Sequence, residues 1–246
     1  MKNKLMAHVV AGYPSEEDCI ELMLGMEELG VGIIEVQIPF SDPIADGETI
    51  MRANDVALDG GMDTKSSFDM LRKARSRGLA AEIYIMSYIQ KLNSLGMETF
   101  CENAARAGAK GLIVPDLPFD SPEYKALLKT TNKHSLELVP VVSPGMSEKR
   151  LSGALNDSPG LVYLTSIKGI TGSKLQAGSE LDELCKQIRR LAPQAELAVG
   201  FGVRDAKDVK QMLKMADMVV VGSAVIRRIK SSGVRGGLEL IKQLVG

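Results

Sequence analysis

The stretch from Leu29 to Ile38 reads LGVGIIEVQI and joins the end of a helical pattern to a short apolar run rich in β-branched residues. Glycine directly after the last apolar residue suits the left-handed backbone that often ends a helix. The run that follows predicts a buried strand. The same order returns at residues 107–114, which read AGAKGLIV. Repetition of helix, glycine and strand is typical of α/β folds with parallel strands.

Working outward from this stretch, eight apolar runs predict strands, at Met6–Ala11, Ile33–Ile38, Glu82–Met86, Gly111–Val114, Leu136–Val142, Leu161–Leu164, Leu197–Phe201 and Met218–Val221. Amphipathic stretches between them predict helices, for example at Glu16–Leu29, Met97–Ala107, Pro122–Thr131, Leu181–Leu191 and Ala206–Met215. Eight units in 246 residues correspond to about 31 residues each, the usual size of one step in a β/α barrel.

The competing fold is a doubly wound open sheet. Its first strand-to-helix turn commonly carries a GxGxxG pattern, whereas the corresponding turn here, residues 11–15, reads AGYPS. We therefore predict an α/β protein with one domain, residues 1–246, folded as a single (β/α)8 TIM barrel.

Composition narrows the classes of function. Thirty Lys and Arg against thirty-one Asp and Glu give a net charge of −1, which disfavours nucleic-acid binding. Cys19, Cys101 and Cys185 lie far apart and only two histidines accompany them, so neither a disulfide framework nor a metal site is expected. The apolar run near the start is too short for a signal peptide or a membrane span. We expect a soluble cytoplasmic protein with small-molecule partners.

The strand at residues 33–38 carries an acidic side chain. Side-chain alternation turns Glu35 toward the barrel interior, opposite Ile34 and Val36. Burial among apolar neighbours makes a carboxylate costly to ionise, which suits a general acid. The alternative interpretation is a structural ion pair with a buried cation, although no lysine or arginine is an obvious partner.

The segment from Pro39 to Gly47 reads PFSDPIADG and follows that strand directly. It therefore lies on the face where barrel enzymes carry their active sites. The segment contributes Asp42 and Asp46, each of which is also an ordinary turn residue in such a context. Beside Glu35, a second carboxylate in a more polar setting would allow one group to donate a proton and the other to accept one.

Three glycine-bearing turns follow the last three strands, at residues 168–172 (KGITG), 200–202 (GFG) and 222–224 (GSA). Their exposed backbone N–H groups can hold an anion. Gly222 and Ser223 also open a predicted helix, Ala224–Lys230, whose positive end suits phosphate. Because barrels often bind phosphate after strands seven and eight, we predict a phosphate site here.

Three other side chains are considered as candidate members of the site. The phenol of Tyr163 is placed to reach across the barrel toward a carboxylate, or else is a packed aromatic with a satisfied hydroxyl. His8 is expected to be a satisfied core or rim histidine rather than a base. His134, beside Lys133, is expected to be a solvated surface residue.

These motifs resemble the tryptophan synthase α-subunit family, whose hallmark is a glutamate followed closely by PFSDP and ADG. Here the hallmark reads EVQIPFSDPIADG at residues 35–47, with Gln37 where the family usually has glycine. The resemblance extends over essentially the whole chain, through AGYP at 11–14, PDLP at 115–118, residues 163–172, GFG at 200–202 and VGSA at 221–224.

The resemblance implies retro-aldol cleavage of indole-3-glycerol phosphate to indole and glyceraldehyde 3-phosphate. By position, Glu35 would be the acid–base residue that protonates C3 of the indole, and Asp46 would bind the indole N–H and stabilise the developing positive charge. Substrate binding would fall to Tyr163, Thr171, Gly172, Phe201, Gly202, Gly222 and Ser223.

The resemblance also implies a partner. The family's α subunit needs no cofactor and feeds indole to a β subunit that carries pyridoxal phosphate, in an α2β2 complex. Asp42 and Pro43 are then expected at the partner interface. The alternatives are a stand-alone indole-3-glycerol phosphate lyase, and a catalytically weakened α-like subunit that activates a β chain allosterically, which Gln37 leaves open. A different phosphosugar barrel, such as an isomerase, is disfavoured by the PFSDP loop.

Overall fold

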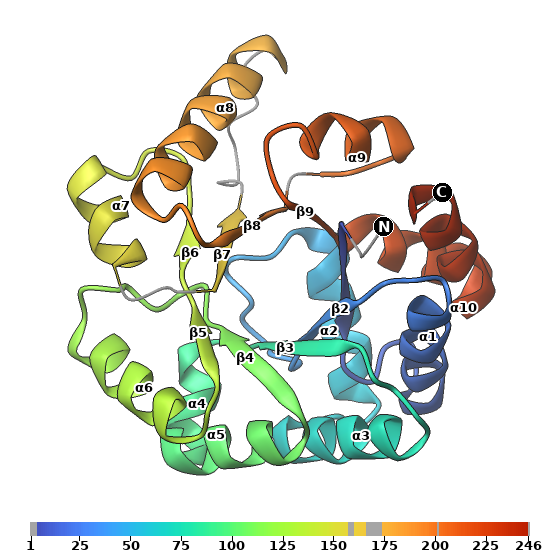
Figure 1. The fold of residues 1–246 in the computed structure, drawn as a ribbon. Helices are drawn as coiled ribbons and strands as arrows, with labels where there is room; N and C mark the ends of the chain where they lie inside the picture. The colour runs from blue at the N-terminus through green and yellow to red at the C-terminus, as the bar shows by residue number, and fades with distance from the viewer. Residues whose placement is uncertain (1–3, 157–159, 166–173, 201, 246) are drawn as a thin grey trace.

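The computed structural model describes residues 4–156, 160–165, 174–200 and 202–245. Within them nine parallel strands form one sheet, in the order β5-β4-β3-β2-β1-β9-β8-β7-β6. Helices surround the sheet on its outer side (Figure 1). The strands are β1 (Leu5–Val10), β2 (Ile33–Gln37), β3 (Glu82–Met86), β4 (Ala109–Ile113), β5 (Glu137–Val139), β6 (Val141–Val142), β7 (Leu161–Thr165), β8 (Glu196–Gly200) and β9 (Met218–Val221). The predicted TIM barrel is confirmed.

The two ends of this sheet are the two halves of one broken strand. The sequence predicts a continuous strand over Leu136–Val142, but Pro140 divides it, and this detail of the prediction is wrong. Before the proline, β5 pairs with β4, and after it β6 pairs with β7. Proline has no N–H to give to a ladder, and its carbonyl instead accepts the N–H of Tyr163 at 3.0 Å. A single segment thus closes the barrel, because its first half pairs with β4 and its second half pairs with β7.

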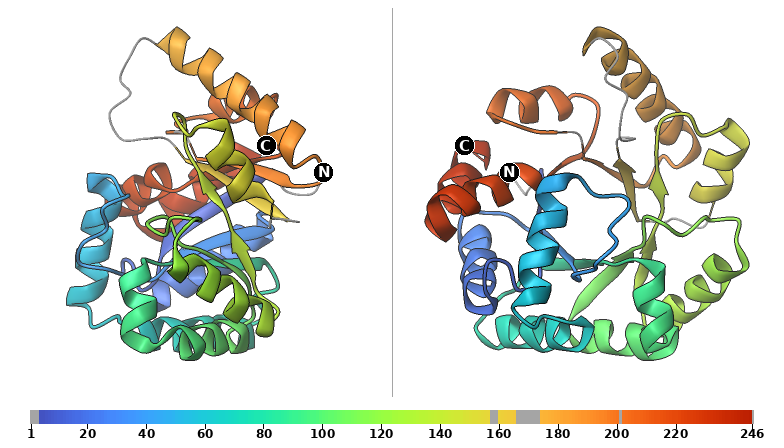
Figure 2. Two further views of the ribbon diagram at one scale, coloured as in Figure 1. Left: turned by 90° about the vertical axis from the view of Figure 1, so that its left-hand side faces the viewer. Right: turned by 180° about the vertical axis from the view of Figure 1, so that it is seen from behind.

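The helices form the outer ring, which two further views show from the side and from behind (Figure 2). No range is predicted from the sequence for α2, α3, α4 and α7. The backbone of α10 is not helical at Ser232 and Gly233, so the part of this helix before the break agrees with the predicted Ala224–Lys230. Within the described ranges no helix is both long and apolar enough to cross a lipid bilayer. The helices are α1 (Glu16–Glu28), α2 (Glu48–Asp59), α3 (Thr64–Ser76), α4 (Ile89–Leu95), α5 (Met97–Arg106), α6 (Pro122–Lys133), α7 (Glu148–Leu155), α8 (Lys174–Leu191), α9 (Ala206–Met212) and α10 (Ser223–Val245).

Side-chain alternation along the strands separates two apolar layers. In β2, Ile34 and Val36 pack between the sheet and the helices, whereas Ile33 belongs to the cluster inside the barrel. Met6 of β1 and Tyr84 of β3 belong to the same inner cluster. Glu35 shares the face of Ile33, so the carboxylate is turned inward as the period of two predicts.

Gly111 lies where the inner face of β4 meets β5. A Cβ atom at this position would lie 2.5 Å from the backbone oxygen of Glu137 and 2.9 Å from its Cβ. Because backbone cannot move aside as a flexible side chain does, we expect Gly111→Ala to lower the free energy of unfolding by about 1 to 3 kcal/mol. Urea denaturation followed by circular dichroism measures this change.

Gly60→Ala is the matched control, because a Cβ there would contact only backbone oxygens, at 3.4 Å, and the backbone φ of −73° is ordinary for alanine. Equal unfolding midpoints for the two variants would show that β4 and β5 pack less closely than described.

Candidate active site

Adjacent strands bring the first two functional side chains together. The register of β1 on β2 pairs His8 with Glu35, so both side chains leave neighbouring strands on the inner face of the barrel. Glu35 is 2% exposed and His8 is 6% exposed. A carboxylate buried this deeply needs partners that offset its lost hydration.

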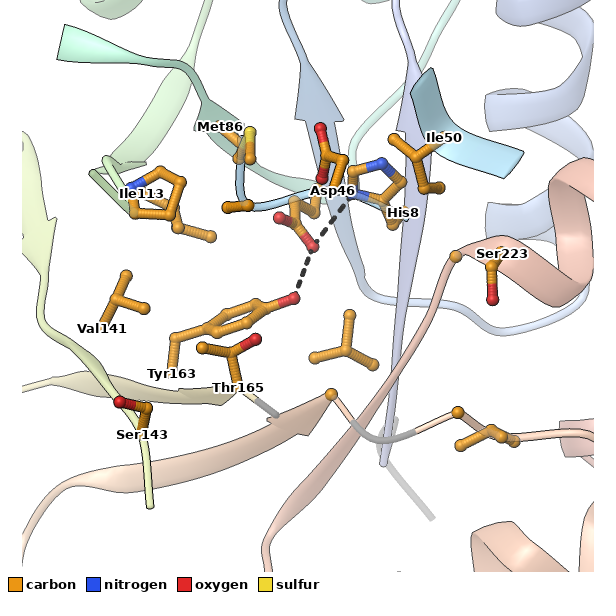
Figure 3. Close-up of a pocket in the computed structure, with 18 of the residues that line it drawn as sticks. His8, Asp46, Ile50, Met86, Ile113, Val141, Ser143, Tyr163, Thr165 and Ser223 are labelled. Carbon is orange, nitrogen blue, oxygen red and sulfur yellow. Dashed lines mark hydrogen bonds and ion pairs between the residues drawn. The ribbon is translucent and has the colours of Figure 1, made fainter. Parts of the chain in front are cut away.

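Two side chains supply those partners, and both contact the same oxygen. The Tyr163 hydroxyl donates to Oε2 of Glu35 at 3.3 Å, and Nδ1 of His8 lies 3.3 Å from the same Oε2. In Figure 3 the dashed lines from His8 and from Tyr163 mark these two contacts, which meet at one oxygen. Burial, together with the Glu35 charge, holds the pKa of the Tyr163 hydroxyl well above its ordinary value, so the phenol remains a proton donor.

Asp46 is held by a separate pair of donors. Its Oδ2 accepts the Gln37 carboxamide N–H at 2.6 Å and the Tyr88 hydroxyl at 3.0 Å. The hydroxyl oxygen of Tyr88 also accepts the backbone N–H of Ala45 at 3.2 Å, which fixes the loop that carries the aspartate. Burial raises the pKa of Asp46, and the Gln37 hydrogen bond opposes that rise. Gln37 therefore bonds to the second acidic residue and leaves Glu35 to other partners.

The rest of the loop between β2 and α2 is also anchored. The backbone N–H of Phe40 donates to Oδ1 of the buried Asn54 at 2.9 Å, and the rings of Phe40 and Tyr88 lie 5.2 Å apart. Asp42 is exposed at the surface of this loop, whereas Pro43 is buried. Of these two residues, only the aspartate presents its side chain to the exterior.

One cavity of about 450 Å³ unites these groups, a volume within the range of small-molecule sites. Among the residues described, no group of three His, Cys, Asp or Glu side chains is arranged to hold a metal ion. Thr171, Gly172 and Phe201 lie outside the described residues. Among the residues that line the cavity are His8 and six residues that the sequence analysis assigns to the site, namely Glu35, Asp46, Tyr163, Gly202, Gly222 and Ser223.

On the side formed by the last strands, the cavity ends at the first turn of helix α10. Helix α10 begins at Ser223, directly after Gly222, as the sequence predicts for this turn. Its first helical hydrogen bond runs from the Ile226 N–H to the Gly222 carbonyl at 3.0 Å. The earlier amides of the helix therefore have no acceptor within it, and they form a positive end beside the cavity.

His8 and Tyr88 contact the two carboxylates of this candidate site, and the sequence analysis gives neither of them a role. His8 is buried, as expected of a core or rim histidine, but its ring is only half satisfied. It lines the cavity, and Nε2 has no hydrogen-bond partner among the described residues. One signal was available: His8 occupies an inward position of the first strand, and that strand lies beside the strand of Glu35 in a barrel. The side chain of His134 is only 16% exposed, which is less than a solvated surface residue would show. Its Nε2 lies 2.8 Å from Oε1 of Glu98.

Comparison with known proteins agrees with this geometry. The family model described as tryptophan synthase alpha chain matches residues 1–243. The chain is 36% identical to the tryptophan synthase alpha chain of Desulforapulum autotrophicum, over 98% of this chain and 93% of that one. It is 37% identical to the tryptophan synthase of Saccharomyces cerevisiae over 92% of its own length, but spans only 32% of that longer protein.

A solved structure gives the same answer. The chain superposes with a TM-score of 0.86 and 29% identity on a chain of the tryptophan synthase a2b2 complex from Pyrococcus furiosus, covering 99% of this chain and 97% of that one. The protein therefore belongs to the tryptophan synthase alpha chain family, whose members are lyases that cleave indole-3-glycerol phosphate.

Proposed function

We propose that Glu35 and Asp46 carry out the cleavage of indole-3-glycerol phosphate in this chain. The observation that supports this assignment is their meeting in one cavity in different surroundings, Glu35 fully buried and Asp46 on a loop. Two carboxylates in unlike environments can act as proton donor and as charge stabiliser in a single reaction.

The reaction needs two proton movements at one carbon–carbon bond. Glu35 donates a proton to C3 of the indole, and Asp46 accepts the indole N–H and stabilises the positive charge that develops on the ring. The carboxylate thus formed on Glu35 takes the proton of the neighbouring glycerol hydroxyl. The bond to the ring then breaks, and its electron pair restores the aromatic indole while the aldehyde forms.

The substrate's phosphate is proposed to bind at the other side of the cavity, at Gly202, Gly222 and the Ser223 end of α10. Free amides and the helix dipole favour a dianion there. Thr171, Gly172 and Phe201 are proposed to complete this part of the site. Anchoring the phosphate fixes the distance from the indole ring to Glu35, which lowers the entropic cost of reaching the reactive geometry.

The chain is further proposed to work with a β subunit, in a complex such as the a2b2 assembly of the Pyrococcus furiosus enzyme. In the loop after β2, Asp42 is exposed and Ile44 is 74% exposed, and these two side chains are proposed to contact this partner. Buried Pro43 would act by shaping the loop. The proton transfers assigned to Glu35 and Asp46 require no cofactor in this chain, and pyridoxal phosphate would belong to the β subunit.

Release of indole from indole-3-glycerol phosphate, measured with and without a tryptophan synthase β subunit, tests the proposal. We expect slow release by the chain alone and a sharp rise when the β subunit is added. Fast release without the partner would instead identify a stand-alone lyase. Absence of release under both conditions would contradict the assignment and favour a subunit that only activates its β chain.

A further inference from the structure

The histidine beside Glu35 is part of the cavity wall, yet the mechanism above does not use it. His8 lies on β1 with Nδ1 at 3.3 Å from Oε2 of Glu35. Since the side chain is almost fully buried, this contact is screened little by water, and a proton can be shared between imidazole and carboxylate. The described residues place no donor on Oε1 of Glu35, which leaves that oxygen for a ligand.

A second observation concerns the other ring nitrogen. Within the described part of the chain, Nε2 of His8 and Oε1 of Gln37 are both buried without a hydrogen-bond partner. Gln37 lies two residues after Glu35, on the same inner face of β2, and its amide nitrogen is already fixed by Asp46. An imidazolium carries N–H on both nitrogens, and a carboxamide oxygen accepts N–H. The two unpartnered atoms are therefore complementary when His8 is protonated.

The charges around the ring favour the protonated state. Facing His8 are Glu35 from β2, Asp46 from the following loop and the Tyr163 phenol from β7, while Gly222 after β9 contacts it without charge. Burial alone would lower the pKa of His8, but the Glu35 carboxylate, assisted by Asp46 and Gln37, raises it above its ordinary value.

We propose that His8 is a positioning residue that stores, on Nδ1, the proton with which Glu35 begins the reaction, while Gln37 holds the second N–H of the ring. The stored proton moves from Nδ1 to Oε2 of the Glu35 carboxylate and leaves a neutral imidazole and a neutral acid. Glu35 then gives a proton to the indole carbon and regains one from the glycerol hydroxyl. The proton returns to His8 after cleavage, so none is consumed.

This proposal rests on the proposed role of Glu35, and its first test uses the lyase reaction. In His8→Asn the carboxamide nitrogen replaces Nδ1 as a donor to Glu35 but cannot store a proton. In the wild-type protein the stored proton is lost when His8 is deprotonated, and the variant has no residue that stores it. We expect the alkaline limb of the pH profile of kcat/KM to move down by about one pH unit or more, with KM unchanged.

The control for this test is His134→Asn, because the chain has only these two histidines. His134 contacts Glu98 at the surface of the barrel and should leave the profile unchanged. Thermal unfolding of each variant checks that the barrel is intact. A profile of His8→Asn that coincides with the wild-type profile would overturn the proposal.

A second measurement does not depend on activity. In protein labelled with ¹⁵N-histidine, His134→Asn assigns the two imidazole signals, and the titration of His8 is then followed in the wild-type and Glu35→Gln proteins. We expect the pKa of His8 to fall by about 1 to 3 when the carboxylate is removed. An unchanged pKa would refute proton sharing even if the lyase reaction proceeds. A fall in the pKa of His8 in Glu35→Gln, together with no indole release by the wild-type protein, would support proton sharing and count against the proposed function.

Discussion

Glu35→Gln is expected to lower kcat for indole release by about 10² to 10⁴, because a carboxamide can neither give a proton to the indole carbon nor take one from the glycerol hydroxyl. The substituted side chain has nearly the same shape, and its oxygen can still accept the hydroxyl of Tyr163. Steady-state kinetics with indole-3-glycerol phosphate measures the loss.

The control is Glu82→Gln, at the exposed start of the neighbouring strand β3, where the carboxylate pairs with Lys110 at 2.8 Å. That variant should retain full turnover, and both proteins should give wild-type circular dichroism spectra. Wild-type turnover in Glu35→Gln would remove this residue from the mechanism.

Asp46→Asn is expected to lower kcat by about 10² to 10³ while KM changes little, because a preorganised charge that faces the developing positive indole acts mainly in the transition state. The remaining oxygen can accept the same N–H and O–H groups from Gln37 and Tyr88, so the loop stays in place. Separate determination of kcat and KM in the absence of a β subunit tests this expectation.

Asp59→Asn, on the exposed end of α2, removes a carboxylate outside the cavity and should leave both constants unchanged. A large rise in KM for Asp46→Asn with kcat unaltered would assign this residue to binding alone.

The sequence predicts the bounds of some strands correctly but does not predict the break within the strand at Pro140. Glu82–Met86 and Met218–Val221 agree with the observed bounds of β3 and β9, because short β-branched runs have few other ways to be buried. The break at Pro140 was missed because the valines on both sides continue one apolar run. The proline itself was the available signal, since it cannot donate to a ladder.

The candidate site was predictable where residues stand close together in sequence and not where strands meet. Glu35 and Asp46 belong to one continuous segment, so their shared cavity follows from the strand and the loop after it. His8 meets Glu35 only through the register of β1 on β2, which no pattern within either strand specifies. The same holds for Asn54 of α2, which accepts the N–H of Phe40 in the loop, a contact that no pattern within the helix specifies.

The broken strand at Pro140 also divides the candidate site residues between two parts of the chain. Glu35 and Asp46 come from the chain before it, while Tyr163 and Gly222 come from the chain after it. Neither segment alone contains a complete site. The two are joined through the sheet where β1 pairs with β9 and where the proline links β5 to β6, and α10 also packs against α1 and α2. Recovery of indole release during refolding is therefore expected to report when the two segments come together, because either segment alone lacks part of the site.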